Sequence, residues 1–358
     1  MKRISPPPVG AQRGLTLIEL MVTIVIALLL ILVIGSVYLA GKKSFNYQNA
    51  TGRMQERARF AMGQISQSMR SVGFQGCGSL TTKVGNMTWA AAWSTSLPAA
   101  EANWSLLDVV PLRAYAAKAT ISPYTSDFAD AEDSKGDILI TLHPESSTER
   151  GITGKVTATN DIPVADNSFD DGDILVAYDC ASIVFFQKTG GSATTIQHGA
   201  SGTPGNCNAS FTTSCGGGTG IELEPGGFVS RLAAEAYYIA PATSGGGSSL
   251  WRRRLQGGTT VAEEIVPRIE GLRVRFGIDN NGDKTADQYL RPNLVAAGDW
   301  GKVVSARVEL LAVSDEGNLA STAQTGIQLD GDASARTTTD RRLYRVYSST
   351  INLRNRTY

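Results

Sequence analysis

The segment from Leu15 to Ala40 constrains this chain more than any other, because every residue in it is uncharged except Glu19. A helix of this length, rising about 1.5 Å per residue, extends roughly 39 Å. That exceeds the hydrocarbon core of a bilayer, which is about 30 Å thick. A cleavable secretory signal has a shorter apolar region of about 7–15 residues, followed by a small-residue cut site. The segment therefore predicts a membrane-spanning helix.

Glu19, the one charged residue in this segment, needs a physical explanation. An ionised carboxylate in a spanning segment costs on the order of 2.5–3.5 kcal/mol on insertion scales. An ordinary signal anchor leaves the acid unexplained, and a carboxylate that snorkels to water at the membrane interface is the plainer alternative. The fourteen residues before the segment contain basic side chains and no acids.

The hexapeptide Gly14-Leu15-Thr16-Leu17-Ile18-Glu19 resembles the cleavage motif of type IV prepilins. The resemblance implies that a membrane peptidase cuts after Gly14 from the cytoplasmic side and methylates the new amino terminus at Leu15. The family usually begins with Phe, so Leu15 departs from it. The resemblance also implies that Glu19 faces the N-terminal amine of a neighbouring subunit in the filament, because a paired charge costs far less in low dielectric than an isolated one.

The helical pattern continues beyond the apolar segment as one amphipathic face, and Gly73 and Gly76 are expected to end it. We therefore expect a cleaved leader (1–14), a transmembrane or filament-core helix (15–40), an amphipathic continuation (41–76) and a β-rich globular domain (77–358). The residues expected to pack on that domain are Met54, Ala58, Ala61, Ile65, Met69 and Val72.

After Phe74 the pattern indicates strands, so the predicted fold class is α+β: a long N-terminal helix on a mainly antiparallel β domain. One face of these strands is predicted to be exposed to water, because charged residues alternate there with apolar ones. The charged residues are Arg273, Arg275, Arg307 and Glu309. The segment 189–220, rich in Gly, Ser and Thr, is expected to be a long loop without a core element. Strands are predicted at Gly136–Leu142, Gly172–Asp179, Ile183–Lys188, Ala234–Ala240, Leu250–Leu255, Leu272–Ile278, Val303–Val313 and Arg342–Arg354.

Stretches such as GDILVAYDC, GLRVRFGIDNNGDKTADQYL and RRLYRVYSSTINLRNR resemble the PilW type of minor pilin, most strongly in the last hundred residues. This resemblance implies a low-abundance subunit, held in the bacterial inner membrane with its domain in the periplasm and then moved into a surface pilus. The implied partners are the major pilin, other minor pilins, the prepilin peptidase and a PilY-type tip adhesin. The implied roles are priming of assembly, twitching motility and adhesion at the tip. A minor pseudopilin of a type II secretion system is the alternative.

Four cysteines in an exported domain suggest disulfides. Cys207 and Cys215 flank a short loop and are expected to pair, which leaves Cys77 for Cys180. Free thiols in a cytosolic protein are the alternative. No CxxC spacing points to zinc.

Little in the sequence favours catalysis, and we expect no enzyme and no required cofactor. Lys and Arg together number 33, as do Asp and Glu, so net charge gives no general reason to bind nucleic acid. His143 and His198 lie in no catalytic motif and are expected at the surface or in turns. The run WRRRL, with Arg252, Arg253 and Arg254, fits either a DNA- or surface-binding patch or a strand whose arginines pair with local acids.

The loop DNNGDKTAD carries side-chain oxygens at its first, third, fifth and ninth positions: Asp279, Asn281, Asp283 and Asp287. This spacing matches the opening of calcium loops, which supply several oxygen ligands. Lys284 stands at the usual Gly position and Leu290 at that of the bidentate Glu, so an EF-hand is not expected. Bound calcium and a plain hairpin turn both remain open.

Overall fold

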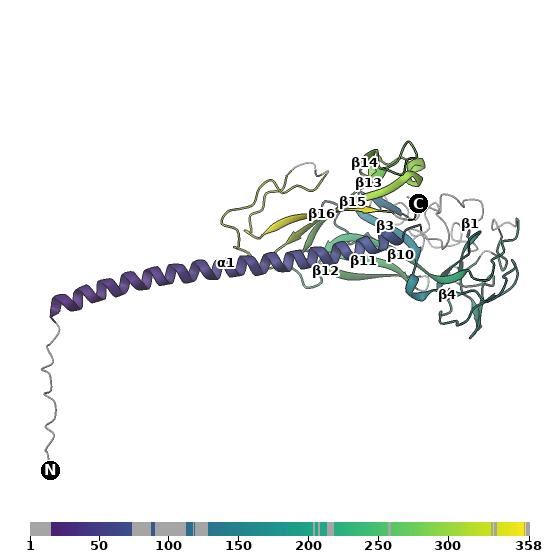
Figure 1. Ribbon diagram of the computed structural model, residues 1–358, viewed down its shortest axis with the longest axis horizontal. Coiled ribbons are helices and arrows are strands. Elements are labelled where there is room, and N and C mark those ends of the chain that lie inside the picture. The colour runs from purple at the N-terminus through teal and green to yellow at the C-terminus, as the bar shows by residue number, and fades with distance from the viewer. Residues whose placement is uncertain are drawn as a thin grey trace, which may run out of the picture. The chain divides into compact units, whose positions relative to one another are not determined.

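The computed structural model describes residues 16–73, 87–89, 112–116, 118, 128–202, 205–206, 208–212, 218–256, 259–330, 332, 335–353 and 355. The chain divides into two compact units, Met1–Gly52 and Arg53–Tyr358. Helix α1 (Leu17–Ser71) begins in the first unit and ends in the second (Figure 1).

Helix α1 ends where the glycines predicted. Its last residue is Ser71, and Gly73 has a φ of 77°, a left-handed conformation that stops a helix with little strain in glycine. The C-terminal part of the chain also caps this end. The side-chain amide of Asn355 donates to the carbonyl oxygens of Arg70 and Val72, at 3.3 and 3.1 Å. Carbonyl groups that the last helical turn leaves unpaired thus gain partners.

The amphipathic stripe in the second half of α1 is confirmed. Its members recur on one helical face, and each is at most 2% exposed, whereas neighbours off the stripe such as Phe60 remain 54% exposed. Burial of this face, and not helix propensity, stabilises the C-terminal half of α1. The buried residues are Met54, Ala58, Ala61, Ile65, Met69 and Val72.

A nine-stranded, mainly antiparallel sheet forms the larger part of the domain, and only β1 runs parallel to its neighbour, β7. Strand β10 is the centre, since it pairs with β4 and β6 near its start and with β3 and β11 toward its end. The strands are β1 (Met87–Trp89), β2 (Leu112–Tyr115), β3 (Ile138–Pro144), β4 (Arg150–Gly151), β6 (Ile174–Tyr178), β7 (Ile183–Gln187), β10 (Phe228–Pro241), β11 (Ser248–Gln256) and β12 (Thr259–Pro267).

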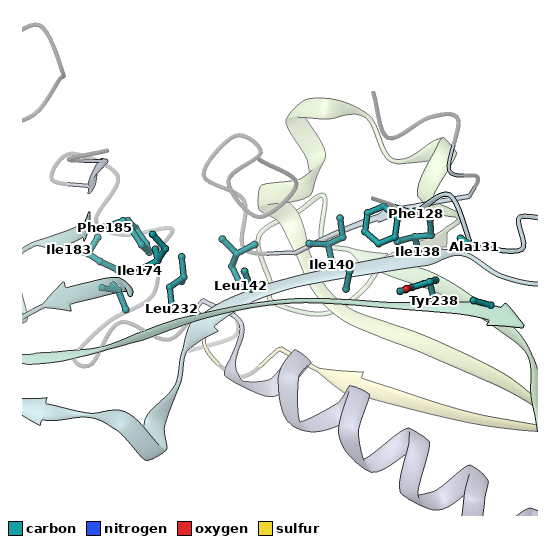
Figure 2. Packing of buried hydrophobic residues seen from close by; sticks show 14 of the residues in the cluster. Phe128, Ala131, Ile138, Ile140, Leu142, Ile174, Ile183, Phe185, Leu232 and Tyr238 are labelled. Atoms are coloured by element: carbon teal, nitrogen blue, oxygen red, sulfur yellow. The ribbon is translucent and has the colours of Figure 1, made fainter. Parts of the chain in front are cut away.

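Alternation along β10 and β3 divides this sheet into two faces. Ile140, Leu142 and Tyr238 belong to a buried hydrophobic cluster on one face (Figure 2). On β10 the alternate residues Glu235 and Tyr237 point instead to α1, where both hydrogen-bond with Ser68. The period of two along a strand accounts for this division.

A second, four-stranded antiparallel sheet has the strand order β14-β13-β15-β16. Gly136, just before β3, pairs with Leu272 of β13 and so joins the two sheets. A side chain at Gly136 would meet Ile239 at 2.9 Å, so the close approach requires glycine. The strands are β13 (Ile269–Ile278), β14 (Gln288–Leu290), β15 (Val303–Val313) and β16 (Tyr344–Asn352).

The prediction that one face of this sheet is exposed to water is wrong for Arg273. The segment between β15 and β16 supplies Asp332, which pairs with Arg273 at 2.9 Å, and Asp330, which pairs with Arg275. Arg273 is consequently only 8% exposed. Alternation correctly identifies a polar face, but it cannot show that a later loop covers that face with matching carboxylates.

Asp137 lies where the two sheets meet, is 1% exposed, and accepts a hydrogen bond of 2.8 Å from the backbone N–H of Val274. Burial raises the pKa of Asp137 to about 6, although this hydrogen bond and Arg273 at 3.6 Å oppose the rise. A carboxyl whose pKa is higher in the folded state than its ordinary value, about 3.9, favours folding in its protonated form.

We therefore expect the free energy of unfolding to fall as the pH rises from about 4 through 6, by at most about 3 kcal/mol, since each pKa unit corresponds to about 1.4 kcal/mol. The Asp137→Asn variant should lose this dependence. Urea unfolding of residues 53–358 at several pH values measures it, and an equal slope in both proteins would contradict the assignment.

The prediction that 189–220 contains no core element is also wrong. It includes β8 (Gly190–Ser192) and β9 (Thr195–Gln197), which form a small sheet with β5 (Ile162–Pro163). Phe211 is fully buried and stacks on His198, with ring centroids 3.8 Å apart. His198 is 3% exposed rather than at the surface, and burial lowers its pKa. Isolated apolar residues among many Gly, Ser and Thr gave too weak a pattern to be recognised.

Candidate assembly site

The N-terminal half of α1 exposes apolar side chains around its whole circumference. Leu17 is 77% exposed, Leu28 56% and Leu39 65%. It is the one helix among the described residues that is long and apolar enough to cross a membrane, with a mean hydropathy of 3.2 in its most apolar window. Such a surface is stable only in lipid or against other apolar helices.

Thr16 and Glu19 form a reciprocal cap at the start of this helix. The backbone N–H and the hydroxyl of Thr16 both donate to Oε2 of Glu19, each at 3.1 Å. The backbone N–H of Glu19 donates in return to the Thr16 hydroxyl at 3.3 Å. This is the capping-box arrangement of a Thr followed three residues later by Glu.

One oxygen of the Glu19 carboxylate stays open. Oε2 accepts both donors of Thr16, whereas Oε1 makes no hydrogen bond within the described part of the chain. A carboxylate has about four acceptor positions, so Glu19 can cap its own helix and still accept a cation from outside. Gly14 and Leu15, the predicted cleavage and methylation residues, lie outside the described residues.

Two family models match separate parts of the chain. The model described as the prokaryotic N-terminal methylation motif matches residues 10–35, a range that contains the predicted cut, the cap and much of the apolar helix. The model described as Type IV Pilus-assembly protein W, PilW, matches residues 236–355. The two matches together support a prepilin of the PilW type.

Comparison with other proteins adds one structural similarity. A type IV-like pilin from Thermus thermophilus is 11% identical, with 86% of this chain and 99% of that chain covered and a TM-score of 0.32. No curated protein matches the chain. The PilW match begins within β10 and includes β11 to β16 together with Asn355, the residue that caps α1.

The WRRRL run of this chain is a strand whose arginines pair with neighbouring acids. Arg252 of β11 bonds Glu235 of β10 at 3.1 Å and also Glu263 of β12. Arg254 lies 3.8 Å from Glu263. These contacts join β11 to both neighbouring strands and, through Glu235 and Ser68, to α1. They favour the strand interpretation of this run over a nucleic-acid patch.

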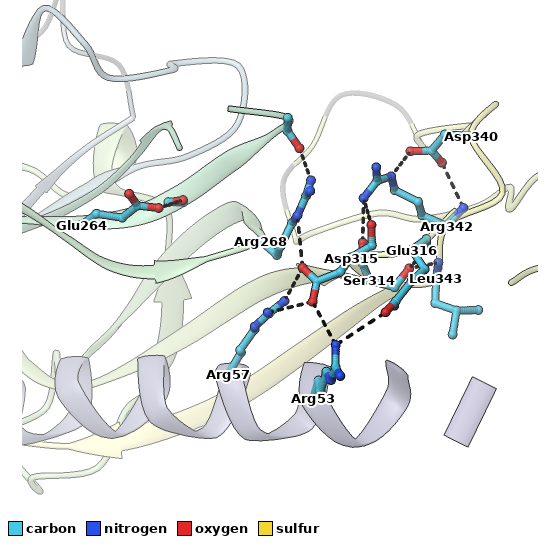
Figure 3. Close-up of polar contacts among 12 residues, drawn as sticks. Arg53, Arg57, Glu264, Arg268, Ser314, Asp315, Glu316, Asp340, Arg342 and Leu343 are labelled. Atoms are coloured by element: carbon cyan, nitrogen blue, oxygen red, sulfur yellow. Dashed lines mark hydrogen bonds and ion pairs between the residues drawn. The ribbon is translucent and has the colours of Figure 1, made fainter. Parts of the chain in front are cut away.

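Asp315, just after β15, holds the N-terminal end of the buried helical stripe (Figure 3). Arg57 of α1 makes a two-pronged contact with its carboxylate, at 2.9 and 2.8 Å, and Arg268 approaches to 3.4 Å. The hydrogen bonding of Arg57, partly opposed by burial, holds the pKa of Asp315 below its ordinary value. The stabilisation is therefore present above about pH 4 and is lost as the pH falls through the lowered pKa.

Arg57→Ala should lower the free energy of unfolding of residues 53–358 by about 1 kcal/mol at pH 7, because both groups remain partly exposed. Arg57→Lys should recover less than half of this, since an ammonium cannot make the two-pronged contact. Urea denaturation at pH 7 and at pH 3 measures both. A loss that persists undiminished at pH 3 would show that packing, not the ion pair, is responsible.

Only one of the four cysteines can be placed. Cys180 follows β6 and is disulfide-bonded, while Cys77, Cys207 and Cys215 lie outside the described residues. The predicted pairing of Cys77 with Cys180 and of Cys207 with Cys215 therefore stays a prediction, which peptide mapping without reduction would test.

The DNNGDKTAD loop is an acid-centred turn between β13 and β14. The Asp279 carboxylate accepts backbone N–H groups from Asn281, Gly282 and Lys284, at 3.2, 2.6 and 2.8 Å. Asp287 accepts the N–H of Asn280 at 2.7 Å, and Asn281 donates to Asp283. Across the described residues, no three His, Cys, Asp or Glu side chains form a group that could hold a metal ion. The hydrogen bonds describe a turn, and calcium binding stays a prediction.

The test of calcium needs Asp283 rather than Asp279. Because Asp279 accepts three backbone N–H groups, its loss should destabilise the turn with or without calcium. If calcium binds, 1–5 mM of the ion, a range of the order used by weak extracellular sites, should raise the Tm of the wild-type domain, and Asp283→Ala should abolish the rise. Equal Tm values with calcium and with chelator would rule the site out.

Two functional contacts were not predicted from the sequence. Ser68 lies at a buried position of α1 between hydrophobic stripe residues, and Asn355 lies three residues before the end of the chain. A polar residue within an apolar helical face is a signal that could have identified Ser68. No local pattern indicates that Asn355 returns to the helix.

Proposed function

We propose that this pilin is a minor subunit of a type IV pilus that helps to prime filament assembly and forms part of the tip complex. In this proposal, cleavage follows Gly14 and methylation occurs at Leu15. The helix holds the subunit in the inner membrane with its domain in the periplasm, and assembly then transfers the helix into the filament core.

One observation supports this proposal most strongly. The exposed apolar half of α1 begins with an acid that caps the helix and whose second oxygen has no hydrogen bond among the described residues. In the filament, Oε1 of Glu19 would accept the N-terminal amine of a neighbouring subunit. The pairing favours one axial position of the helix, because burying a carboxylate in a low-dielectric environment costs free energy unless a cation lies beside it. The structure thus supports both anchoring and assembly by the same segment.

The domain's role in this proposal is lateral contact with other minor pilins, the major pilin and a PilY-type tip adhesin. Its connection to the helix is well defined, through the buried stripe, the Arg57–Asp315 pair and the Asn355 cap. A force or displacement on the domain would thus reach the helix through many contacts.

Deletion of the gene, with complementation by the full-length chain, tests the proposal. We expect loss of surface pili and of twitching, with protein secretion unchanged. Normal piliation together with blocked secretion would instead identify a type II secretion pseudopilin.

A further inference from the structure

Among the described residues, strand β16 has one partner strand and one open edge. It pairs with β15 along its full length without a register shift. Two flanking hydrogen bonds, from Ser314 N–H to Leu343 O and from Leu353 N–H to Val304 O, each 2.9 Å, fix its orientation. In an antiparallel ladder alternate residues direct both backbone groups to the same neighbour. The odd-numbered residues of β16 therefore bond to β15.

The even-numbered residues direct their N–H and C=O groups away from β15. The N–H of Tyr344 is occupied, because it donates to Oε1 of Gln324 at 2.7 Å. The following four outward positions have no backbone hydrogen bond to any part of the chain that the structure describes. They are Val346, Ser348, Thr350 and Asn352.

Edges of this kind usually carry protection against pairing, and the other long edge of the domain has it. Strand β12 has an irregular register opposite Trp251, two adjacent acids at Glu263 and Glu264, and a terminal proline, Pro267. Strand β16 is as long, but it is regular, lacks proline and has no charge from Val346 to Asn352. A long, regular and uncharged edge is a template for another strand.

We propose that the outer edge of β16 receives an extended segment of another pilus subunit as an additional strand, with a carboxylate of that segment opposite Arg345. This inference rests on the proposed function, because it places the partner in the same filament. Arg345 is exposed and has no ion-pair partner in the described parts of the chain. Strand addition of this kind supplies affinity through main-chain hydrogen bonds and selectivity through side chains.

The charge of the edge argues for a different chain and against a second copy paired through the same strand. The segment Tyr344–Asn352 contains Arg345 but no Asp or Glu. Two β16 edges facing each other would therefore bring no carboxylate to either arginine. A partner strand with one acid near an end satisfies both the backbone groups and the guanidinium.

Proline at an outward position provides the test. In Ser348→Pro the lost N–H is one that β15 does not use, so the domain should fold. We expect full-length Ser348→Pro to be processed and to keep the wild-type Tm, but to enter sheared pili at about one tenth of the wild-type amount. Ser348→Ala, which keeps the N–H, should enter normally. Wild-type incorporation of Ser348→Pro would overturn the proposal.

A second measurement keeps the proposal testable if the proline variant unfolds. A photo-crosslinking residue at Thr350 of the full-length chain should link to a peptide of another pilus subunit that contains Asp or Glu. Mass spectrometry identifies that peptide. Arg345→Glu should impair assembly by placing two carboxylates opposite each other, and replacing the acid of the partner peptide by Lys should restore it. Crosslinks confined to this chain or to a second copy of it would contradict the proposal, as would the absence of any crosslink.

The deletion strain distinguishes failure of the proposed minor-pilin function from failure of the strand-addition proposal. If deletion leaves pili unchanged, the proposed minor-pilin function fails. If deletion removes pili and Ser348→Pro restores them fully, the function stands and the strand-addition proposal alone is wrong.

Discussion

Replacement of Glu19 by alanine should lower incorporation of the pilin into pili by about tenfold while leaving proteolytic processing largely intact. The structure gives the residue two tasks, since Oε2 caps the helix through Thr16 and Oε1 has no hydrogen-bond partner in the described part of the chain, which leaves it open for a cation. A tenfold change corresponds to about 1.4 kcal/mol, a modest fraction of the cost of an unpaired carboxylate in an apolar environment. Quantification of the subunit in sheared pili measures the effect.

Two further variants separate the charge pair from the cap. Glu19→Gln retains an acceptor for Thr16 but has no charge, so it should be as defective as alanine. Thr16→Val loses the hydroxyl and weakens the helix start by about 1 kcal/mol, yet keeps the carboxylate, so incorporation should fall no more than about threefold. Wild-type incorporation of Glu19→Gln would show that the cap, and not the charge, is what assembly requires.

Ile65→Ala should produce the largest loss of stability among single truncations on the helical stripe. Ile65 is fully buried at its centre, and removal of a buried Ile side chain to Ala costs about 2–5 kcal/mol, the value depending on how far the cavity collapses. Because the stripe joins helix to domain, we also expect reduced accumulation of the full-length subunit. Urea denaturation of residues 53–358 measures the change in free energy of unfolding.

Phe60→Ala is the matched control, because it removes a larger side chain from the same helix. Phe60 is 54% exposed, so its truncation should cost less than about 1 kcal/mol. Because alanine has the higher helix propensity, propensity alone would stabilise both variants. Equal losses in both would therefore mean that burial on the domain does not determine the stability of this segment.

The sequence was sufficient to predict the parts of the fold that follow a regular period. The stripe from Met54 to Val72 repeats every three or four residues, and all its members are buried. Each of the eight predicted strands is present, with Val303–Val313 matching β15 at both ends. Strand β12 is not predicted, because two adjacent acids, Glu263 and Glu264, interrupt the alternation. In the structure Glu263 accepts a hydrogen bond from Arg252, and Glu264 accepts one from Ser249.

The remaining errors concern contacts between distant segments. Burial of Arg273 depends on Asp332, 59 positions later, and burial of His198 depends on Phe186 and Phe211. In the candidate site, Glu19 was identified from its incongruous charge, but its bond to Thr16 was not anticipated. The capping-box spacing was visible in the sequence, whereas the return of Asn355 to α1 was not.

The amino terminus of the subunit in purified pili tests the central claim most directly. Pili sheared from cells and analysed by intact-mass and peptide mass spectrometry should contain this chain beginning at Leu15 and carrying an N-methyl group. A chain that still begins at Met1 and remains in the membrane fraction, absent from the pili of a piliated strain, would contradict the assignment as a filament subunit.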